Sequence, residues 1–231
     1  MEIYFISPFE KIAQVTLKES ILGRAKKNGF VNYHFCNLFD FADPPHNSID
    51  DAPYGGGVGM IIKPEPIFRI IDNIIGENSE GKIYRILFPT PDGKIFTQKI
   101  AKELSTEEKL IFISGHYKGL DQRVRDELVT DEISIGDYIL TGGDLPSLVI
   151  IDSIVRLIPG VIGKIESAEK DSFSNPLLDF PHYTRPEIFR GLKVPDVLLS
   201  GHHGKIEKWR QEKRIEKTRT RRPDLLANIK N

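Results

Sequence analysis

Two glycine-containing loops carry the residues in this sequence that are best suited to holding a small ligand. One runs from Gly115 to Gly119 after the apolar run Leu110–Ser114, and the other runs from Asp137 to Asp144 after a shorter apolar stretch. An apolar run that ends at glycine is typical of a buried strand entering a loop. Open α/β sheets bind ligands at such loops, beside the carboxyl ends of their strands. Glycine spacing alone is equally compatible with a pair of tight turns.

A longer polar loop, from Asn37 to Lys63, contains the segment YGGGVGM at residues 54–60. It is not a P-loop, because no lysine followed by serine or threonine comes after Gly59. It is not a dinucleotide-binding fingerprint either, because Met60 stands where the third glycine belongs. A connection of this length is usually functional or disordered. A lid, a backbone surface for a ligand and a disordered loop therefore all stay open.

Positive charge is concentrated at the C-terminus. Residues 201–231 carry ten lysine and arginine side chains against four acidic ones, although the whole chain has a net charge of −1. A basic segment on an acidic body favours contacts with the phosphates of a nucleic acid. The alternative is a solvated helix with internal Glu–Lys pairs.

The composition is that of a soluble globular protein, with 39% hydrophobic and 28% charged residues in a chain of 231. No segment approaches the roughly 20 apolar residues that span a bilayer. The N-terminus, MEIYFISPFEK, lacks the basic region of a signal peptide. The single cysteine, Cys36, excludes an intrachain disulfide, and its apolar surroundings predict a reduced, buried thiol. We expect a cytoplasmic protein with no membrane partner and no metal site.

The order of apolar runs predicts an α/β fold with a parallel sheet. The expected strands are residues 2–7, 30–36, 83–88 and 110–114, followed by an apolar stretch at 133–136, and the expected helices are residues 8–29, 64–75, 97–104, 121–129 and 145–158. Residues 88–93, FPTPDG, are expected to form a loop at a strand end. The helix at 145–158 is apolar nearly all round, so it should be buried, and a dimer interface would account for that. The expected domains are an α/β domain at 1–160, a linker at 161–170 and a helical domain at 171–231.

Longer motifs resemble the bacterial tRNA (guanine-N1)-methyltransferase family, a branch of the SPOUT methyltransferases. They occur in order over nearly the whole chain: YGGGVGM (54–60), SGHYKGLDQR (114–123), ISIGDYILTGGDLPSLVIIDSIVRLIPGVIG (133–163), KDSF (170–173), PHYTRP (181–186) and RRPDLL (221–226). The resemblance implies a SPOUT-type parallel sheet with a deep trefoil knot formed by residues 88–143, and a small all-helical C-terminal domain. Knots are too rare in proteins to be expected without it.

The resemblance also implies a reaction, the transfer of a methyl group from S-adenosylmethionine to N1 of guanine at tRNA position 37, 3′ of the anticodon. The implied cofactor-binding residues lie in the knot loops: Phe88, Pro89, Thr90, Pro91, Gly115, Tyr117, Gly119, Ile135, Gly136, Tyr138, Ile139, Leu140, Gly142 and Gly143. Ile135, Tyr138 and Leu140 would line the adenine. S-adenosylmethionine has no phosphate, so no phosphate-binding loop is needed, and stimulation by Mg²⁺ is left open.

Two residues match the catalytic positions of the family. Asp171 would be the general base that removes the proton from guanine N1, and Arg156 would stabilise the charge that develops on O6. Without the resemblance, Asp171 would be assigned as a helix N-cap or linker residue and Arg156 as a helix C-terminal arginine. Because Asp171 follows a linker, it is expected to reach the cofactor of a second subunit. The implied homodimer therefore shares its active sites.

The implied partner is tRNA, whose guanine must leave its stack to be methylated. The substrate-binding candidates are Asp50, Asp51, Lys118, His182, Tyr183 and Arg185, together with the basic tail. At Lys118 many family members carry a glutamate, so this chain is expected to read the base through Asp50 or Asp51, or to select it less strictly.

Two other functions stay open. A SPOUT methyltransferase that acts on a ribose hydroxyl would not need Asp171 as a base for a ring nitrogen. A non-catalytic RNA-binding module would use the basic tail alone and would not bind S-adenosylmethionine.

Overall fold

The structure is a computed structural model that describes residues 1–76, 84–163, 171–173 and 176–227. The chain divides into two compact units, Met1–Gly163 and Lys164–Asn231, and each is described by itself. Most of the linker predicted at 161–170, and the predicted first residue of the strand at 83–88, lie outside the described residues.

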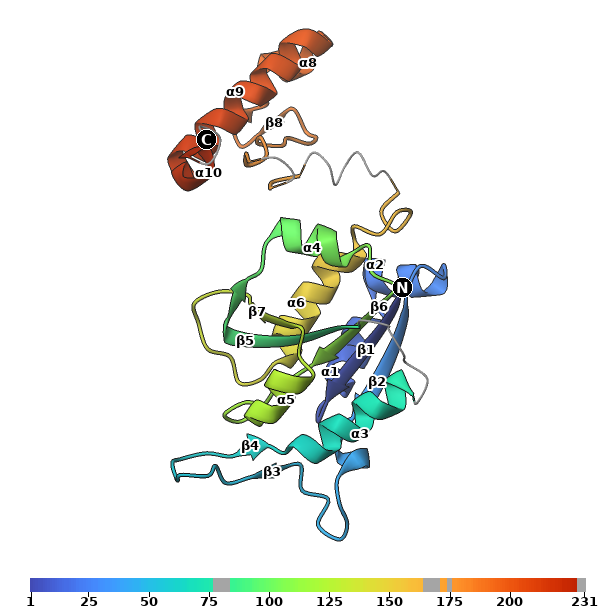
Figure 1. The fold of residues 1–231 in the computed structure, drawn as a ribbon. Coiled ribbons are helices and arrows are strands. Elements are labelled where there is room, and N and C mark those ends of the chain that lie inside the picture. The colour runs from blue at the N-terminus through green and yellow to red at the C-terminus, as the bar shows by residue number, and fades with distance from the viewer. Residues whose placement is uncertain (77–83, 164–170, 174–175, 228–231) are drawn as a thin grey trace. The chain divides into compact units, whose positions relative to one another are not determined.

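Within the described residues, the first unit is built on one five-stranded sheet (Figure 1). The strand order is β2-β1-β6-β5-β7, and each neighbouring pair is parallel. The strands are β1 (Glu2–Ser7), β2 (Asn32–Asn37), β5 (Arg85–Ile95), β6 (Lys109–Ile113) and β7 (Asp131–Ser134). The predicted α/β class with a parallel sheet is therefore confirmed.

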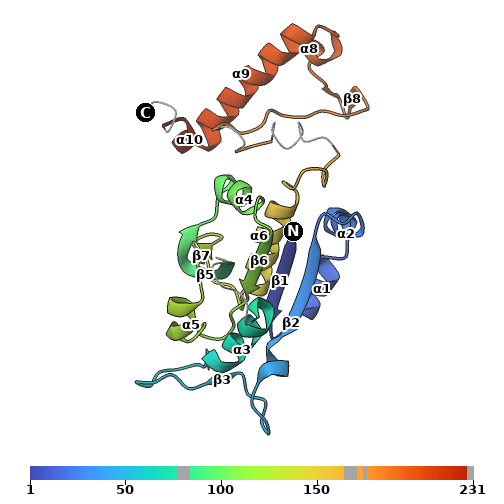
Figure 2. The same ribbon diagram turned by 45° about the vertical axis from the view of Figure 1, so that its right-hand side comes forward.

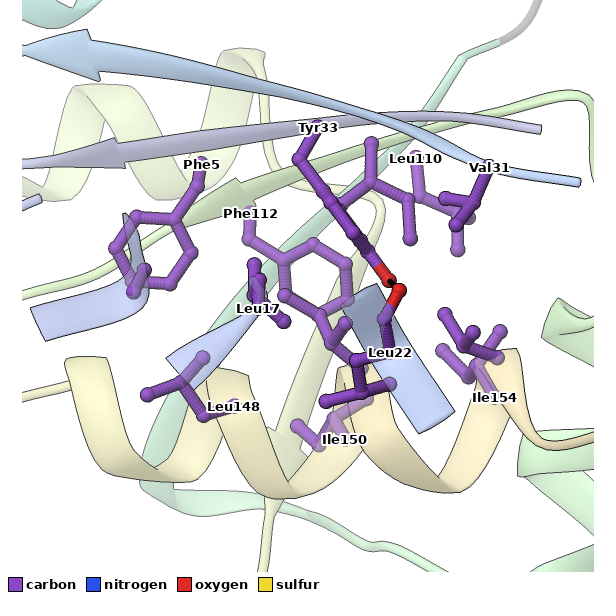
Figure 3. Packing of buried hydrophobic residues seen from close by; sticks show 14 of the residues in the cluster. Phe5, Leu17, Leu22, Val31, Tyr33, Leu110, Phe112, Leu148, Ile150 and Ile154 are labelled. Atoms are coloured by element: carbon purple, nitrogen blue, oxygen red, sulfur yellow. Dashed lines mark hydrogen bonds between the residues drawn. The ribbon is translucent and has the colours of Figure 1, made fainter. Parts of the chain in front are cut away.

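Helices cover both faces of this sheet (Figures 1 and 2). One face carries α1 (Lys11–Thr16), α2 (Ser20–Lys27), α4 (Gln98–Leu104) and α6 (Asp144–Val155), and the other carries α3 (Pro64–Ile75) and α5 (Gln122–Glu127). Side chains of β6 alternate between the two cores: Leu110 and Phe112 enter the first, Ile111 and Ile113 the second. Figure 3 shows Phe112 between the sheet and α6. Burial on both faces explains why β6 (KLIFI) is a nearly continuous apolar run.

Strand β5 is longer than the sequence predicts. The segment FPTPDG, expected to be a loop, lies inside the strand, and Pro89 and Lys94 both pair with Ile133 of β7. The residues between them form a bulge, where prolines are tolerated because no ladder N–H is required of them. The predicted loop is therefore a bulge within β5, the strand next to the edge strand β7.

The prediction of a single helix at residues 8–29 is wrong, because the chain breaks between α1 and α2 at the extended Glu19 and at Ser20, whose φ is 50°. Ile12 and Val15 of α1 are 45% and 68% exposed. Helix α6, which packs against α1, is also not fully buried, since Leu145 and Val149 are 55% and 48% exposed. One sheet face cannot cover every apolar residue of both helices.

The long polar loop after β2 contains defined structure. It forms a short 3₁₀ helix (Leu38–Phe41) and an antiparallel pair of strands, β3 (Asp50–Asp51) and β4 (Ile61–Ile62). Between them Tyr54 and Val58 are exposed. The backbone N–H of Lys118 donates to the carbonyl of Met60 at 2.9 Å, so this β3–β4 hairpin, residues 50–62, contacts the loop that follows β6.

The second unit is not all-helical as predicted. It contains the antiparallel strands β8 (Ile188–Phe189) and β9 (Leu192–Lys193) before α8 (Asp196–Leu199), α9 (His203–Arg221) and α10 (Pro223–Ala227). Thr218 of α9 is buried, and its Oγ1 accepts a hydrogen bond from the N–H of Leu178 at 2.9 Å. This bond fixes the start of the unit on its longest helix. None of the helices described here is long and apolar enough to cross a membrane.

Candidate functional site

A cavity of about 360 Å³ lies at the carboxyl ends of β6 and β7, beside residues 88–91 in the middle of β5. Three segments line it: the β5 bulge, the loop at residues 115–119 and the stretch at 133–143. Pro146 is also a lining residue. All fourteen predicted cofactor-binding residues are among the lining residues, and so is Lys118. The structure thus brings together residues from three separate segments, at the sheet edge where α/β proteins bind ligands.

The cavity wall is made of apolar side chains and loop backbone. Pro89, Ile133 and Leu140 contribute apolar surface, while Tyr117 and Ile139 are exposed at the rim. The described lining contains Lys118 but no carboxylate. A volume of this size with mainly apolar walls suits a small organic ligand. Apolar side chains next to loop backbone are what an adenine ring requires, and no phosphate cradle is present among the described lining residues.

Two of the predicted glycines are required by contact between the two loops. Gly143 N–H donates to the carbonyl of Gly115 at 2.7 Å, and a Cβ on Gly143 would lie 2.7 Å from the Gly115 nitrogen. A Cβ on Gly142 would lie 2.3 Å from Cε1 of His116. Neither position therefore has room for a side chain, whether or not a ligand is bound.

A buried chain of polar side chains beside the cavity was not singled out from the sequence. Asp144, at the first turn of α6, accepts a hydrogen bond from Ser7 Oγ at 2.5 Å and one from His116 Nε2 at 2.6 Å. A second pair, Ser114 and Ser147, forms a hydrogen bond between its two hydroxyls at 2.9 Å. The available signal was weak, because a histidine in one loop and an aspartate after another are common in any sequence.

The β5 bulge is held from outside by Arg125 of α5. Its Nε and Nη2 donate to the two carboxylate oxygens of Glu132 at 2.7 Å each, and Nη2 also donates to Asp92 at 2.8 Å. Thr90 Oγ1, which belongs to the cavity wall, donates to Asp92 as well. The hydrogen bond from Arg125, followed by that from Thr90, lowers the pKa of Asp92.

The other first-unit candidates do not line the cavity. Arg156 is the C-cap residue of α6, as expected of a helix C-terminal arginine. Asp50 and Asp51 form β3, where Asp51 Oδ1 accepts from the N–H of Ala52 at 2.7 Å. Lys118 connects the two regions, since it lines the cavity and its side chain lies against Gly59 of the β3–β4 hairpin.

The remaining candidates belong to the second unit. Asp171 is half-buried near its start. His182 pairs with Asp179 at 2.8 Å, Tyr183 is half-exposed with its ring centroid 6.4 Å from that of Trp209, and Arg185 precedes a cis proline. Helix α9 has exposed cations at Lys205, Lys208 and Arg219, as well as internal ion pairs such as Lys213–Glu216. Both predictions for the basic tail, phosphate contacts and internal pairing, are compatible with this surface.

Comparison with known proteins gives one consistent result. Residues 1–228 match the family model described as tRNA (guanine-1)-methyltransferase TrmD. Proteins named tRNA (guanine-N(1)-)-methyltransferase from Brevibacillus brevis and Bacillus subtilis are 51% and 50% identical, each over 99% of this chain and 93% of the relative. The protein of the same name from Dehalococcoides mccartyi is 48% identical over 99% of this chain and 92% of its own length.

Proposed function

The chain belongs to the tRNA (guanine-1)-methyltransferase family, and from this premise we propose that it transfers a methyl group from S-adenosylmethionine to N1 of guanine at tRNA position 37. The observation that carries the proposal is the cavity, whose lining contains every residue implied for cofactor binding. The names of the relatives support the base and the atom that are methylated.

In this proposal the cavity holds S-adenosylmethionine, which supplies a methyl group made electrophilic by its sulfonium. Ile135, Tyr138 and Leu140 contact the adenine, and the loop backbone bonds its polar edge. The bulge at 88–91 closes the cavity on the β5 side. We also propose that residues 88–143 form the deep trefoil knot of the family, which is supported by the bond between Gly143 and Gly115, at the ends of two segments far apart in sequence.

The protein's own groups handle the proton and the charge. The Asp171 carboxylate accepts the proton of guanine N1, which lets the N1 electron pair attack the methyl group. The Arg156 guanidinium stabilises the negative charge that builds on O6 as N1 loses its proton. Whether Mg²⁺ stimulates the reaction is a question for the same assay.

We propose a homodimer in which Asp171 of one subunit serves the cavity of the other. The proposal is supported by apolar side chains exposed on two packed helices, Ile12 and Val15 of α1 and Leu145 and Val149 of α6. Large exposed apolar patches of this kind mark protein interfaces. In a two-fold dimer the same patch on each subunit covers its counterpart.

The shared site has a direct test. Asp171→Ala and Arg156→Ala proteins are each expected to be inactive, and are mixed after exchange of subunits. If Asp171 acts in trans and Arg156 in cis, mixed dimers contain one intact site and one doubly defective site. About a quarter of wild-type activity should then return, because half of the dimers are mixed and each has one working site. No recovery despite demonstrated exchange would refute the assignment of Asp171 and Arg156 of one site to different subunits.

For the RNA, we propose that α9, His182, Tyr183 and Arg185 hold the tRNA, while Lys118 and the β3–β4 hairpin with Asp50 and Asp51 receive the extruded guanine. Exposed cations on α9 support phosphate contacts. Lys118 is well placed for the role, because it contacts both the cavity and the hairpin. We also propose a cytoplasmic location, since the proposed substrate is tRNA.

The deciding experiment measures transfer of labelled methyl from S-adenosylmethionine to unmodified tRNA, followed by nucleoside analysis. Wild-type protein should form 1-methylguanosine, and tRNA with adenosine at position 37 should not be labelled. Asp171→Ala should bind cofactor normally but transfer no methyl. Asp196→Ala is the control, because Asp196 is an exposed aspartate of the same unit, paired with Lys193.

Each alternative function predicts a different result in this assay. Methylation on ribose would identify another kind of SPOUT enzyme, and tRNA binding without cofactor binding would identify a non-catalytic module. Either result would refute the proposed reaction.

A further inference from the structure

The buried carboxylate of Asp144 joins three segments that are remote in sequence. It is 3% exposed, one oxygen accepts from Ser7 Oγ at 2.5 Å, and the other accepts from His116 Nε2 at 2.6 Å. Ser7 and Asp144 are 137 residues apart, and His116 and Asp144 are 28 apart. A buried carboxylate is stable only when hydrogen bonds replace its hydration. The position of Asp144 in the first turn of α6 adds a favourable helix dipole.

These contacts meet at the wall of the cavity. Ser7 ends β1, His116 lies in the loop after β6, and Asp144 directly follows the loop that ends at Gly143. His116 itself lines the cavity. The two loops that enclose the cavity are therefore tied to each other through His116 and to the end of β1 through Ser7.

The imidazole of His116 is held in one place. Its Nε2 donates to Asp144, and the Phe9 ring packs edge-on with its centroid 4.9 Å away. The imidazole also lies against Gly142, where a side chain would overlap the ring. If the ring left this position, one oxygen of Asp144 would remain buried without a donor. The loops are thus fixed in place before any ligand binds, which lowers the cost of binding.

We propose that His116 is a positioning residue of the cofactor site: through Asp144 and Ser7 it holds the loops at 115–119 and 135–143 at the spacing that S-adenosylmethionine requires. The inference rests on the proposed function, since it assigns the cavity to that cofactor. His116 contacts no reacting atom in this role. Its loss should therefore weaken cofactor binding and raise KM for S-adenosylmethionine, while kcat at saturating cofactor changes much less.

The competing explanation is that the polar chain only stabilises the fold. In that case His116 variants would unfold at lower temperature, but the folded protein would bind cofactor as the wild type does. The cofactor affinity of the folded variant separates the two explanations. Rescue by a residue that keeps the hydrogen bond to Asp144 separates them as well.

The experiment measures binding of S-adenosylhomocysteine by calorimetry and KM and kcat for S-adenosylmethionine, on the full-length protein. His116→Ala should weaken binding about tenfold or more, the loss typical of a hydrogen bond to a charged group. His116→Gln, whose amide nitrogen can donate to Asp144, should recover most of the affinity. His34→Ala is the matched control, because His34 Nε2 lies 2.5 Å from Glu2 but outside the cavity.

A second pair of variants reaches the same contact without removing a polar group. Gly142→Ala should weaken binding by displacing the imidazole, and the double variant with His116→Ala should bind no worse than His116→Ala alone, because the ring it displaces is absent. Gly142→Ala and His116→Gln, both of which keep a polar side chain next to Asp144, carry the test if His116→Ala does not fold.

Binding by His116→Ala within twofold of wild type, a glutamine variant no better than alanine, or additive losses in the double variant would each overturn the proposal. Failure of the proposed function is distinguishable, because then the wild-type protein itself would neither bind S-adenosylhomocysteine nor transfer methyl groups.

Discussion

Arg125 provides a quantitative test of how the β5 bulge supports the cavity. Its guanidinium joins α5 to Glu132 of β7 and to Asp92 of the bulge, and lies 5.5 Å from the centroid of Phe88. Phe88 lines the cavity, and Thr90 reaches the same carboxylate of Asp92. Replacing Arg125 by alanine removes all these contacts. We expect both a less stable first unit and a cavity wall that is no longer held.

The size of the effect follows from exposure. A buried hydrogen bond to a charged group contributes about 1.5–3 kcal/mol, whereas an exposed ion pair contributes about 0–1 kcal/mol. The Arg125 side chain is 20% exposed, Glu132 31% and Asp92 62%, so we expect a loss near the lower bound, about 1.5 kcal/mol. For a unit of this size, that lowers Tm by about 3–6 °C.

Thermal unfolding and cofactor binding together provide the assay. Arg125→Ala should lower Tm of the first unit by the stated amount and weaken binding of S-adenosylhomocysteine. Arg123→Ala on the same helix is the control, because Arg123 is exposed and pairs only with Asp121 of the described residues. An unchanged Tm with unchanged cofactor affinity would refute the assigned role of Arg125.

The pH dependence has a definite sign. Because the pKa of Asp92 is lowered in the folded protein, its pairing with Arg125 stabilises the fold fully above the ordinary pKa of 3.8. This stabilisation is lost as pH falls through the lowered pKa. The Tm difference between wild type and Arg125→Ala should therefore be constant around neutral pH, and its Asp92 part should disappear as pH falls below 3.8 and through the lowered pKa.

Three further substitutions test other parts of the molecule. Gly59→Ala places a Cβ 2.9 Å from Lys118 Cγ at a residue with φ +102°. It should lower methyl transfer to tRNA more than Gly57→Ala, whose Cβ would have its nearest neighbour 4.0 Å away at a similarly positive φ. Equal effects would show that backbone strain alone matters. Leu145→Glu should convert the dimer to monomer in light scattering, since it places a charge in the proposed apolar interface; an unchanged mass would exclude α6 from the interface. Lys205→Glu should raise KM for tRNA several-fold without changing cofactor affinity, and the salt dependence of tRNA binding should fall by roughly one phosphate contact. An unchanged salt dependence of tRNA binding would show that Lys205 does not contact the RNA.

The sequence by itself determined the class of the fold and the position of the cavity. The loosely alternating stretch at 2–7 predicted β1, and the apolar run at 110–114 predicted β6, because a strand buried on both faces is rich in apolar residues. Motif resemblance added the residues at the strand ends, and the structure places all fourteen around one cavity. That these residues bind S-adenosylmethionine stays a prediction, as do the roles of Asp171 and Arg156.

Only the tertiary structure decided which of these segments meet. The bond between Ser7 and Asp144 spans 137 residues, and neither residue has a local pattern that announces it. The two prolines of FPTPDG indicated a loop, but β7 pairs on both sides of them and makes a bulge. The apolar residues on nearly all sides of α6 predicted a buried helix, yet Leu145 and Val149 are exposed because the sheet face is already covered. A local pattern records what a segment prefers, whereas contacts depend on the space that the rest of the chain leaves.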